Sequence, residues 1–264
     1  MMPEQRGSAP AANFLRHSGA VLRLVSIAAF VALWQLAAWL SQDVDVLPGP
    51  ARVISSLIEH ATEGDLFFHL GMTLQRVGIA FSLAMLIGSA IGLMMGRLRW
   101  TNNALDGVLV IALNVPALVT IILCYIWLGL NELAAVTAVA VNKIPTVAVT
   151  VREGARALDR QLLDVGRAYR IGRARTLFRI ILPQLYPYLL AAARSGLALI
   201  WKIVLVVELL GRSNGVGFQL GTFFNFFDIT SILAYTLAFV LVIFLLEAMI
   251  FRPIDRRIGR WRPA

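Results

Sequence analysis

Two lysines within apolar stretches are the first residues whose types suggest chemistry. Lys143 and Lys202 are the only lysines among 264 residues, and each stands near the middle of an apolar run. A lysine at the centre of a bilayer costs about 2.5–3.5 kcal/mol on insertion scales, so it normally faces a helix bundle, a cavity or a carboxylate. The lysines are either a cationic patch beside a path for anions or members of structural ion pairs. Glu208 is off the helical face of Lys202, but it could pair with Lys143 across two helices.

The same sequence argues against several kinds of enzyme. A P-loop for ATP needs a Gly-Lys pair, whereas Asn142 and Trp201 precede the two lysines. An intramembrane hydrolase needs a Ser, Asp or His constellation at membrane depth, and the three histidines lie outside the predicted spans. His60 stands beside Glu59 and near Glu63, which is ordinary for a solvated surface helix. We therefore expect no catalytic residue, no metal site and no cofactor bound by this chain.

An arginine-rich stretch indicates a different kind of function. Residues 162–183 read LLDVGRAYRIGRARTLFRIILP, with five arginines among leucines and isoleucines. Four other residues are spaced at i, i+3, i+4 and i+7, which predicts one face of a short amphipathic helix. They are Leu162, Val165, Gly166 and Tyr169. Gly172 could end this helix, and a second short helix should stop at Pro183. Two such helices beside a membrane suit docking into a groove of another protein, with attraction to anionic lipid as the alternative.

These residues must be positioned by membrane helices, because the composition is that of a membrane protein. The chain is 59% hydrophobic and 15% charged, against about 25% charged residues in soluble domains. A helix of about 20 apolar residues spans a bilayer. Six stretches reach or approach that length, namely residues 22–40, 76–96, 107–130, 133–151, 188–210 and 229–251. We predict an all-α, polytopic membrane protein with six transmembrane helices, an interfacial helix after the first, and bends at Pro116 and Pro145.

The charges predict how the chain lies in the membrane. The net charge is +9, and most arginines fall on one side of the predicted spans. The other side receives only Arg52 and Arg212 among the arginines, and its first loop is acidic, which is the positive-inside pattern with both termini in the cytoplasm. The expected divisions are a cytoplasmic tail (1–20), a six-helix membrane domain (21–255) with a cytoplasmic loop (152–187), and a basic tail (256–264). No aromatic-and-basic module accompanies the arginines, so nucleic acid is not an expected partner.

The sequence resembles the permease subunits of binding-protein-dependent ABC importers. Their cytoplasmic loop carries Glu-Ala-Ala, three residues, Gly, nine residues and then Ile-x-Leu-Pro. The corresponding residues here are Asp164, Val165, Gly166, Arg170, Ile180, Leu182 and Pro183. The second half of the motif is intact and the first half is degenerate, with Gly172 as a substitute for the glycine replaced by Arg170. The segments LPGP, NVPALVTIILCYIWLGL and VVELLGRSNGVGFQL resemble the nitrate, sulfonate and taurine branch, over residues 34–255.

The resemblance implies a half-transporter in the bacterial inner membrane. Its partners would be a second permease copy, two cytoplasmic ATPase subunits that bind ATP and Mg, and an external solute-binding protein. The loop would be the coupling helix on the ATPase. The expected coupling residues are Asp164, Val165, Gly166, Tyr169, Arg170, Gly172, Ile180, Leu182 and Pro183.

The remaining predicted site residues belong to the path and its outer end. The expected translocation pathway includes Lys143, Lys202, Glu208, Pro116 and Asn114. The expected external loop includes Asn214, Gly215 and Gly217, where the alternative for the glycines is a plain turn. The solute would be a small organic anion such as a sulfonate, taurine or a nitrate-like compound. A stand-alone secondary transporter is the alternative function, although the two halves show no clear inverted repeat.

Overall fold

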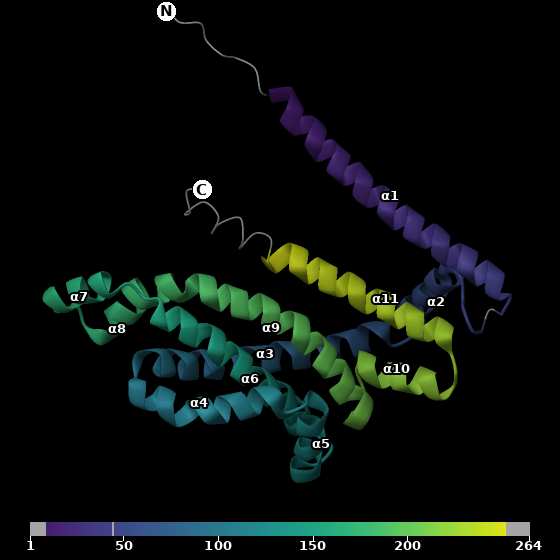
Figure 1. The fold of residues 1–264 in the computed structure, drawn as a ribbon. Helices are drawn as coiled ribbons and strands as arrows, with labels where there is room; N and C mark the ends of the chain where they lie inside the picture. Colours follow the sequence, from purple (N-terminus) through teal and green to yellow (C-terminus); the bar gives the residue numbers. More distant parts are fainter. Residues whose placement is uncertain (1–8, 44, 252–264) are drawn as a thin grey trace, which may run out of the picture.

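The computed structural model describes residues 9–43 and 45–251, so residues 1–8 and the predicted basic tail 256–264 lie outside the described residues. Figure 1 shows the arrangement of the helices. In chain order they are α1 (Ala9–Ser41), α2 (Pro50–Thr62), α3 (Leu66–Arg97), α4 (Arg99–Asn114), α5 (Ala117–Leu128), α6 (Glu132–Arg156), α7 (Arg160–Ala168), α8 (Arg173–Thr176), η1 (Leu177–Ile181), α9 (Leu182–Gly211), α10 (Val216–Asn225), α11 (Ile229–Leu246) and η2 (Glu247–Phe251), where η marks a π-helical turn.

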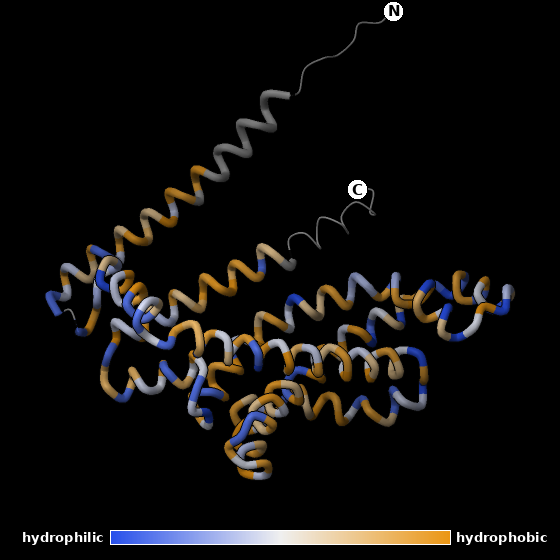
Figure 2. Tube along the Cα trace, turned by 180° about the vertical axis from the view of Figure 1, so that it is seen from behind, coloured by the Kyte–Doolittle hydropathy of each residue, from blue (hydrophilic) through white to orange (hydrophobic). Residues whose placement is uncertain are grey.

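The described part of the chain confirms the predicted all-α membrane fold. Five helical segments are long and apolar enough to cross a membrane, and the bent pair α4 and α5 makes a sixth if it is counted as one span. Figure 2 shows apolar residues along the lengths of these helices and hydrophilic ones gathered near their ends. α1 begins at Ala9, so part of the segment 1–20 that we predicted as a tail is helical.

The predicted third span is two helices rather than one. α4 ends at Asn114 and α5 begins at Ala117, and their axes differ by 98°. Pro116 has no backbone N–H, and a residue before proline is driven to extended backbone, which Val115 adopts with φ −71° and ψ 123°. The predicted bend at Pro116 is therefore confirmed. Pro145 has a weaker effect, because α6 continues through it.

The centre of the bundle is built by α3, α6 and α9. α3 approaches α6 through glycines one turn apart: a Cβ added at Gly88 would lie 2.7 Å from the Cβ of Val147, and one at Gly92 would lie 2.9 Å from the Cβ of Val151. Small residues permit close contact between helices in a bilayer, where the lipid itself is as apolar as leucine. The predicted interfacial helix is α2, which packs on α11, where His60 Nε2 lies 2.9 Å from Ser231 Oγ.

Candidate functional site

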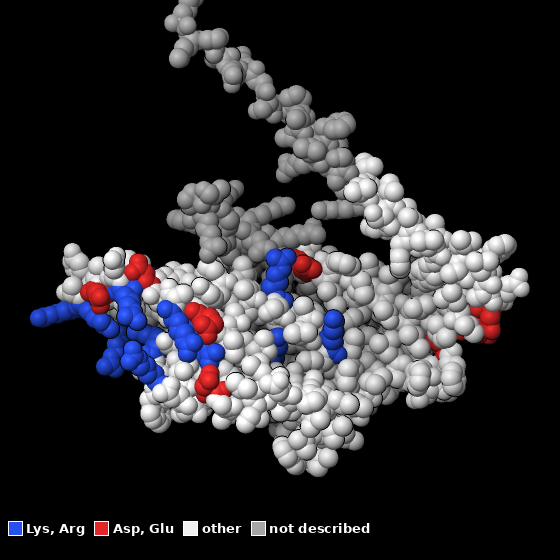
Figure 3. All heavy atoms as spheres, viewed as in Figure 1, with Lys and Arg blue, Asp and Glu red and all other residues white. Residues whose placement is uncertain are grey.

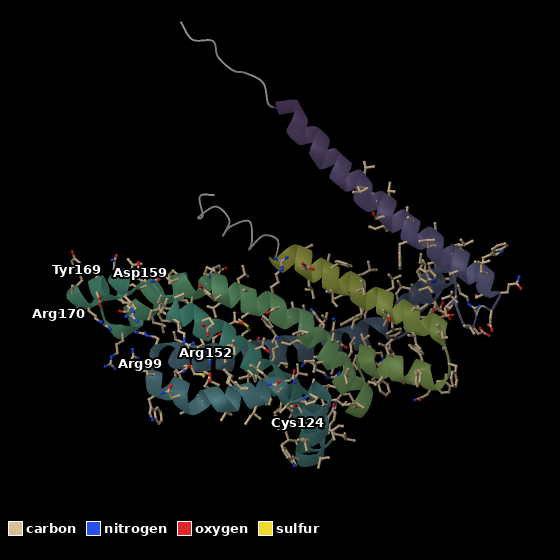
Figure 4. The ribbon with its side chains drawn as sticks, viewed as in Figure 1. Arg99, Cys124, Arg152, Asp159, Tyr169 and Arg170 are labelled. Carbon is tan, nitrogen blue, oxygen red and sulfur yellow. The ribbon has the colours of Figure 1, made fainter. Side chains whose placement is uncertain are left out.

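The predicted loop helix is present, and a capping residue begins it. Asp159 precedes α7, and its carboxylate accepts a hydrogen bond of 2.8 Å from the backbone N–H of Gln161, as expected of an N-cap. Three of the four predicted face residues are exposed on this helix: Leu162, Val165 and Tyr169. We call these three the α7 outer face. Tyr169 is 78% exposed, and Figure 4 shows it with Asp159 at the far end of the molecule.

Gly166, the fourth predicted face residue, lies on the inner side of α7. It is buried, and a Cβ there would lie 2.9 Å from Cδ1 of Ile180 in η1. The prediction that Gly166 shares the exposed face is therefore wrong, because η1 packs against this side of α7 and requires a residue without a side chain. The close approach that we expected at Gly166 is made within the chain itself.

Arg170 makes the turn after α7. Its φ is +49°, and its N–H donates to the carbonyl of Arg167 at 2.9 Å. The N–H of Ile171 donates to the carbonyl of Gly166, also at 2.9 Å. This pair of bonds is the Schellman motif, whose left-handed residue is usually glycine. The prediction that Gly172 supplies the turn is wrong, because its φ is −59° and it precedes α8.

The second half of the loop merges with the long helix that follows it. One helical segment runs from Arg173 to Gly211 and contains Ile180, Leu182 and Pro183. The prediction that Pro183 stops a helix is wrong, because it lies in the first turn of α9, where a missing N–H is tolerated. The N–H of Leu182 instead donates five residues back, in the π-helical pattern of η1. The loop is thus continuous with a membrane span.

The end of the bundle that carries α7 and α8, which we call the arginine end, is strongly basic. Figure 3 shows Lys and Arg side chains gathered there. Asp164 lies mid-helix, with its carboxylate 2.9 Å from Arg167 Nη1 in an exposed pair. Two open cavities of about 550 and about 490 Å³ adjoin α7. Both are lined by Arg97, Leu163 and Arg167.

A buried charge network occupies the opposite end of the bundle. Arg76, on α3, is 2% exposed. Its Nε and Nη2 donate to the two carboxylate oxygens of Glu132 at 2.9 and 2.6 Å, and its Nη1 donates to Glu208 Oε1 at 2.6 Å. The same guanidinium donates to the backbone carbonyl of Asn214 at 2.9 Å and to its side-chain oxygen. Contacts of this fork geometry fix orientation as well as charge.

Glu208 connects three elements through this network. It is fully buried at 0% exposure. Its Oε2 accepts from Thr73 Oγ1 on α3 at 2.9 Å and from the N–H of Gly217 on α10 at 2.8 Å. The possible Lys143–Glu208 pair is wrong, because Arg76, Thr73 and Gly217 bond this carboxylate and Lys143 Nζ has no hydrogen-bond partner among the described residues.

The external-loop glycines are more than a plain turn. Gly215 has φ +108°, which favours glycine, and its N–H donates to His69 Nδ1 at 3.0 Å. The other ring nitrogen, Nε2, lies 2.7 Å from Nε2 of Gln219, and which of the two donates depends on the tautomer of the ring. The loop is fixed on α3 by backbone donors.

The other predicted pathway residues lie in different environments. Lys143 is 2% exposed, and its Nζ has no hydrogen-bond partner in the described structure. Lys202 is exposed on α9. Asn114 and Pro116 are exposed at the bend between α4 and α5, where Asn114 Nδ2 donates to the carbonyl of Val110 at 2.8 Å. The two lysines thus differ, because Lys143 is buried within the bundle and Lys202 is exposed.

Arg76 and Glu132 of the charge network were not predicted, although Glu208 and Asn214 were. The predicted second span begins at Arg76, whereas α3 begins at Leu66 and contains Arg76. The signal was available, since the whole of α3 is apolar enough to span a membrane. The partners of Arg76 could not be read from the sequence, because Glu132 and Glu208 are far away along the chain.

Known proteins similar to this chain are membrane components of transporters. Residues 52–260 match the family described as binding-protein-dependent transport system inner membrane component. A protein of Bacillus subtilis (strain 168) named as an aliphatic sulfonates transport permease, SsuC, is 27% identical over 99% of this chain and 98% of its own length. The taurine transport system permease protein TauC of Escherichia coli (strain K12) is 26% identical, covering 91% of this chain and 89% of its own. The nitrate import permease protein NrtB of Synechocystis sp. is 24% identical, and the match covers 81% of this chain and 80% of its own length.

A solved structure supports the fold. The crystal structure of an amino acid ABC transporter with histidines matches 76% of this chain and 98% of its own chain, with a TM-score of 0.61 and 21% identity. The resemblance that we inferred from the loop and span motifs is confirmed, because the family match covers most of the chain. This chain therefore belongs to the binding-protein-dependent transport system inner membrane components.

Proposed function

We propose that this chain is the permease subunit of an ATP-driven importer for a small organic anion, and that it docks a separate ATPase at its arginine end. The observation that carries the proposal is the α7 outer face. Leu162, Val165 and Tyr169 are exposed on a helix beyond the membrane spans. A cap fixes the start of this helix and a Schellman turn fixes its end. A rigid apolar helix face suits a protein groove better than it suits water.

The connection of α7 to the membrane bundle suits coupling. Gly166 packs on Ile180, and Ile180 belongs to the helical segment that ends at Gly211. Glu208, near the far end of that segment, bonds Arg76 and Gly217. A displacement of α7 would therefore be carried along one helix to the charge network at the opposite end of the bundle.

The proposed topology puts the arginine end and both termini in the cytoplasm, following the positive-inside rule. Two permease copies would associate with two ATPase subunits, which bind ATP and Mg. The chain has no Gly-Lys pair for a P-loop of its own. The external solute-binding protein would meet the opposite end, where Asn214 and Gly215 are fixed on α3 and Gly217 is bonded to Glu208 of α9.

An organic anion is the proposed solute class. Aliphatic sulfonates and taurine, which are organic, stand in the names of two relatives, and nitrate, an inorganic anion, stands in the name of a third. All three carry an anionic group of oxygen atoms. Lys143, Lys202, Asn114 and Pro116 remain proposed pathway residues. Glu208 is already bonded within the charge network, so we propose for it a role in closing the outer end rather than in contacting the solute.

The test is ATP hydrolysis by the reconstituted complex. The permease is purified with its ATPase, placed in proteoliposomes and supplied with its binding protein, loaded in turn with an aliphatic sulfonate, taurine or nitrate. We expect one of these anions to stimulate hydrolysis and to accumulate inside. Uptake by the permease alone, driven by an ion gradient without ATP, would instead show the secondary transporter and overturn the proposal.

A further inference from the structure

The most unusual buried group outside the charge network is the amine of Lys143. It lies in the middle of α6, its side chain is 2% exposed, and its Nζ has no hydrogen-bond partner among the described residues. A buried ammonium without a partner is unfavourable, because it loses hydration and gains no compensating charge. Glu208, the acidic residue that the sequence offered as a partner, is fully bonded elsewhere. Lys143 therefore has no anionic partner among the described residues.

α9 passes close to the Lys143 side chain at Gly196. A Cβ added at Gly196 would lie 3.3 Å from Lys143 Cε and 3.9 Å from Phe81 of α3. The glycine thus permits α9 to close over the lysine stem, at a point where a larger residue would press on it.

The backbone of α6 is weakened next to the lysine. Pro145 lies inside the helix, so no N–H is available there for the carbonyl one turn earlier. Two polar side chains, Asn142 and Thr146, flank Lys143 and are half-buried on this helix. Polar groups at membrane depth usually face a bundle interior or a wet path. The amine, the local weakness and the polar neighbours thus coincide on one turn of α6.

We propose that Lys143 is the group of the translocation pathway that binds the anionic part of the solute, and that α9 at Gly196 covers it in this state and uncovers it when α6 and α9 separate. The ligand class is a small anion with a sulfonate or similar head group. This inference rests on the proposed function, since it assumes that an anion crosses the bundle. It assigns the two lysines different roles, because Lys202 is exposed on the surface of α9.

The test measures the charge preference of the path beside Lys143. Thr146→Cys in a Cys124→Ser background serves as the reporter, because Thr146 is three residues after Lys143 and on the same face of the helix. The complete complex in proteoliposomes is treated with two methanethiosulfonate reagents of similar size, one carrying a sulfonate and one a trimethylammonium group. Their modification rates are compared without nucleotide and with ATP bound under conditions that prevent hydrolysis.

We expect the sulfonate reagent to react faster in one of these two states. In that state, Lys143→Met and Lys143→Gln should lower the ratio of sulfonate to trimethylammonium rates about tenfold or more, as for a local charge that attracts an anion. Lys143→Arg should keep the ratio, and Arg52→Gln, which removes an exposed cation paired loosely with Asp45, should leave it unchanged.

An unchanged ratio in the Lys143→Met and Lys143→Gln complexes, or no reaction at Thr146→Cys in either state, would overturn the inference. The measurement needs no transported solute. If an anion stimulates the importer but the Lys143 variants leave the ratio of sulfonate to trimethylammonium rates unchanged, the proposed function stands and this inference is rejected. A lysine-dependent ratio in a complex that fails to import would support anion binding by Lys143 and contradict the proposed function.

Discussion

Arg76 Nη1 and Glu208 Oε1 lie 2.6 Å apart within the bundle, and the Glu208 side chain is wholly buried. The two residues come from α3 and α9, which places a charged contact between helices that otherwise pack through apolar and small side chains. Such a pair is weak evidence for added stability, because desolvation offsets its attraction. Breaking it on one side is a different matter, because a charge is then left buried without a partner.

Arg76→Met should destabilise the permease by about 3–5 kcal/mol, the usual cost of removing one partner of a buried ion pair. Arg76→Met combined with Glu208→Gln should recover part of this loss, because the buried carboxylate is then uncharged. Thermal unfolding of the purified complex measures both. Arg52→Gln removes the same charge from an exposed, loose pair with Asp45 at 3.8 Å, and should have little effect. Equal loss in both single variants would contradict the role of burial.

The spans and the loop helix were predictable because both follow from local periodicity. Apolar run length gave the membrane helices, and the apolar spacing around Val165 gave α7. The orientation of Gly166 was not predictable, because it depends on η1 packing against that side of α7. Arg76 was not predicted as the partner of Glu208 for a related reason. A charged residue lowers the hydropathy of an apolar stretch, but Arg76 can be buried because Glu132 and Glu208, which are distant along the chain, bond it.

Arg170→Gly should stabilise the turn after α7. Arg170 has φ +49°, and a left-handed conformation costs a residue with a side chain about 1–2 kcal/mol, a cost that glycine lacks. The thermal midpoint of the complex should rise while the ATPase remains attached. Arg170→Ala is the control, since it removes the charge and keeps the Cβ. If alanine stabilises as much as glycine, the gain comes from charge and not from backbone strain.

Gly166→Leu should disturb the contact between α7 and η1. The added side chain would meet Cδ1 of Ile180, which lies 2.9 Å from the position of a Cβ, and overpacking of this kind costs about 1–3 kcal/mol. We expect weaker co-purification of the ATPase, because α7 is displaced from its position. Gly166→Leu with Ile180→Ala should restore much of the attachment by making room. A double variant no better than Gly166→Leu would argue that Gly166 meets the ATPase directly.

The topology is tested by cysteine accessibility in intact cells. Single cysteines replace exposed residues in a Cys124→Ser background. Glu63→Cys and Ser213→Cys should react with an impermeant thiol reagent, because the proposed topology puts both outside. Arg160→Cys and Arg175→Cys, at the arginine end, should react only after the cells are opened. The reverse pattern would reject the positive-inside orientation.

The α7 outer face should dominate attachment of the ATPase. Tyr169 is 78% exposed, and a docked aromatic side chain is a common anchor of an interface, where truncation often costs about 2 kcal/mol or more. Tyr169→Ala and Val165→Ala should therefore weaken ATPase co-purification and lower solute-stimulated hydrolysis. The fold of the permease should be unaffected, because neither side chain is buried within it.

An exposed arginine of the same loop distinguishes docking from attraction to lipid. Arg173→Gln removes a surface charge and leaves the α7 outer face intact, so its effect on ATPase attachment should be small. If anionic lipid instead held this loop, each basic residue would contribute about 1 kcal/mol, and the arginine change would matter more than the loss of an apolar side chain. Attachment that survives Tyr169→Ala and Val165→Ala but fails with Arg173→Gln would mean that charge, and not the α7 outer face, holds the ATPase.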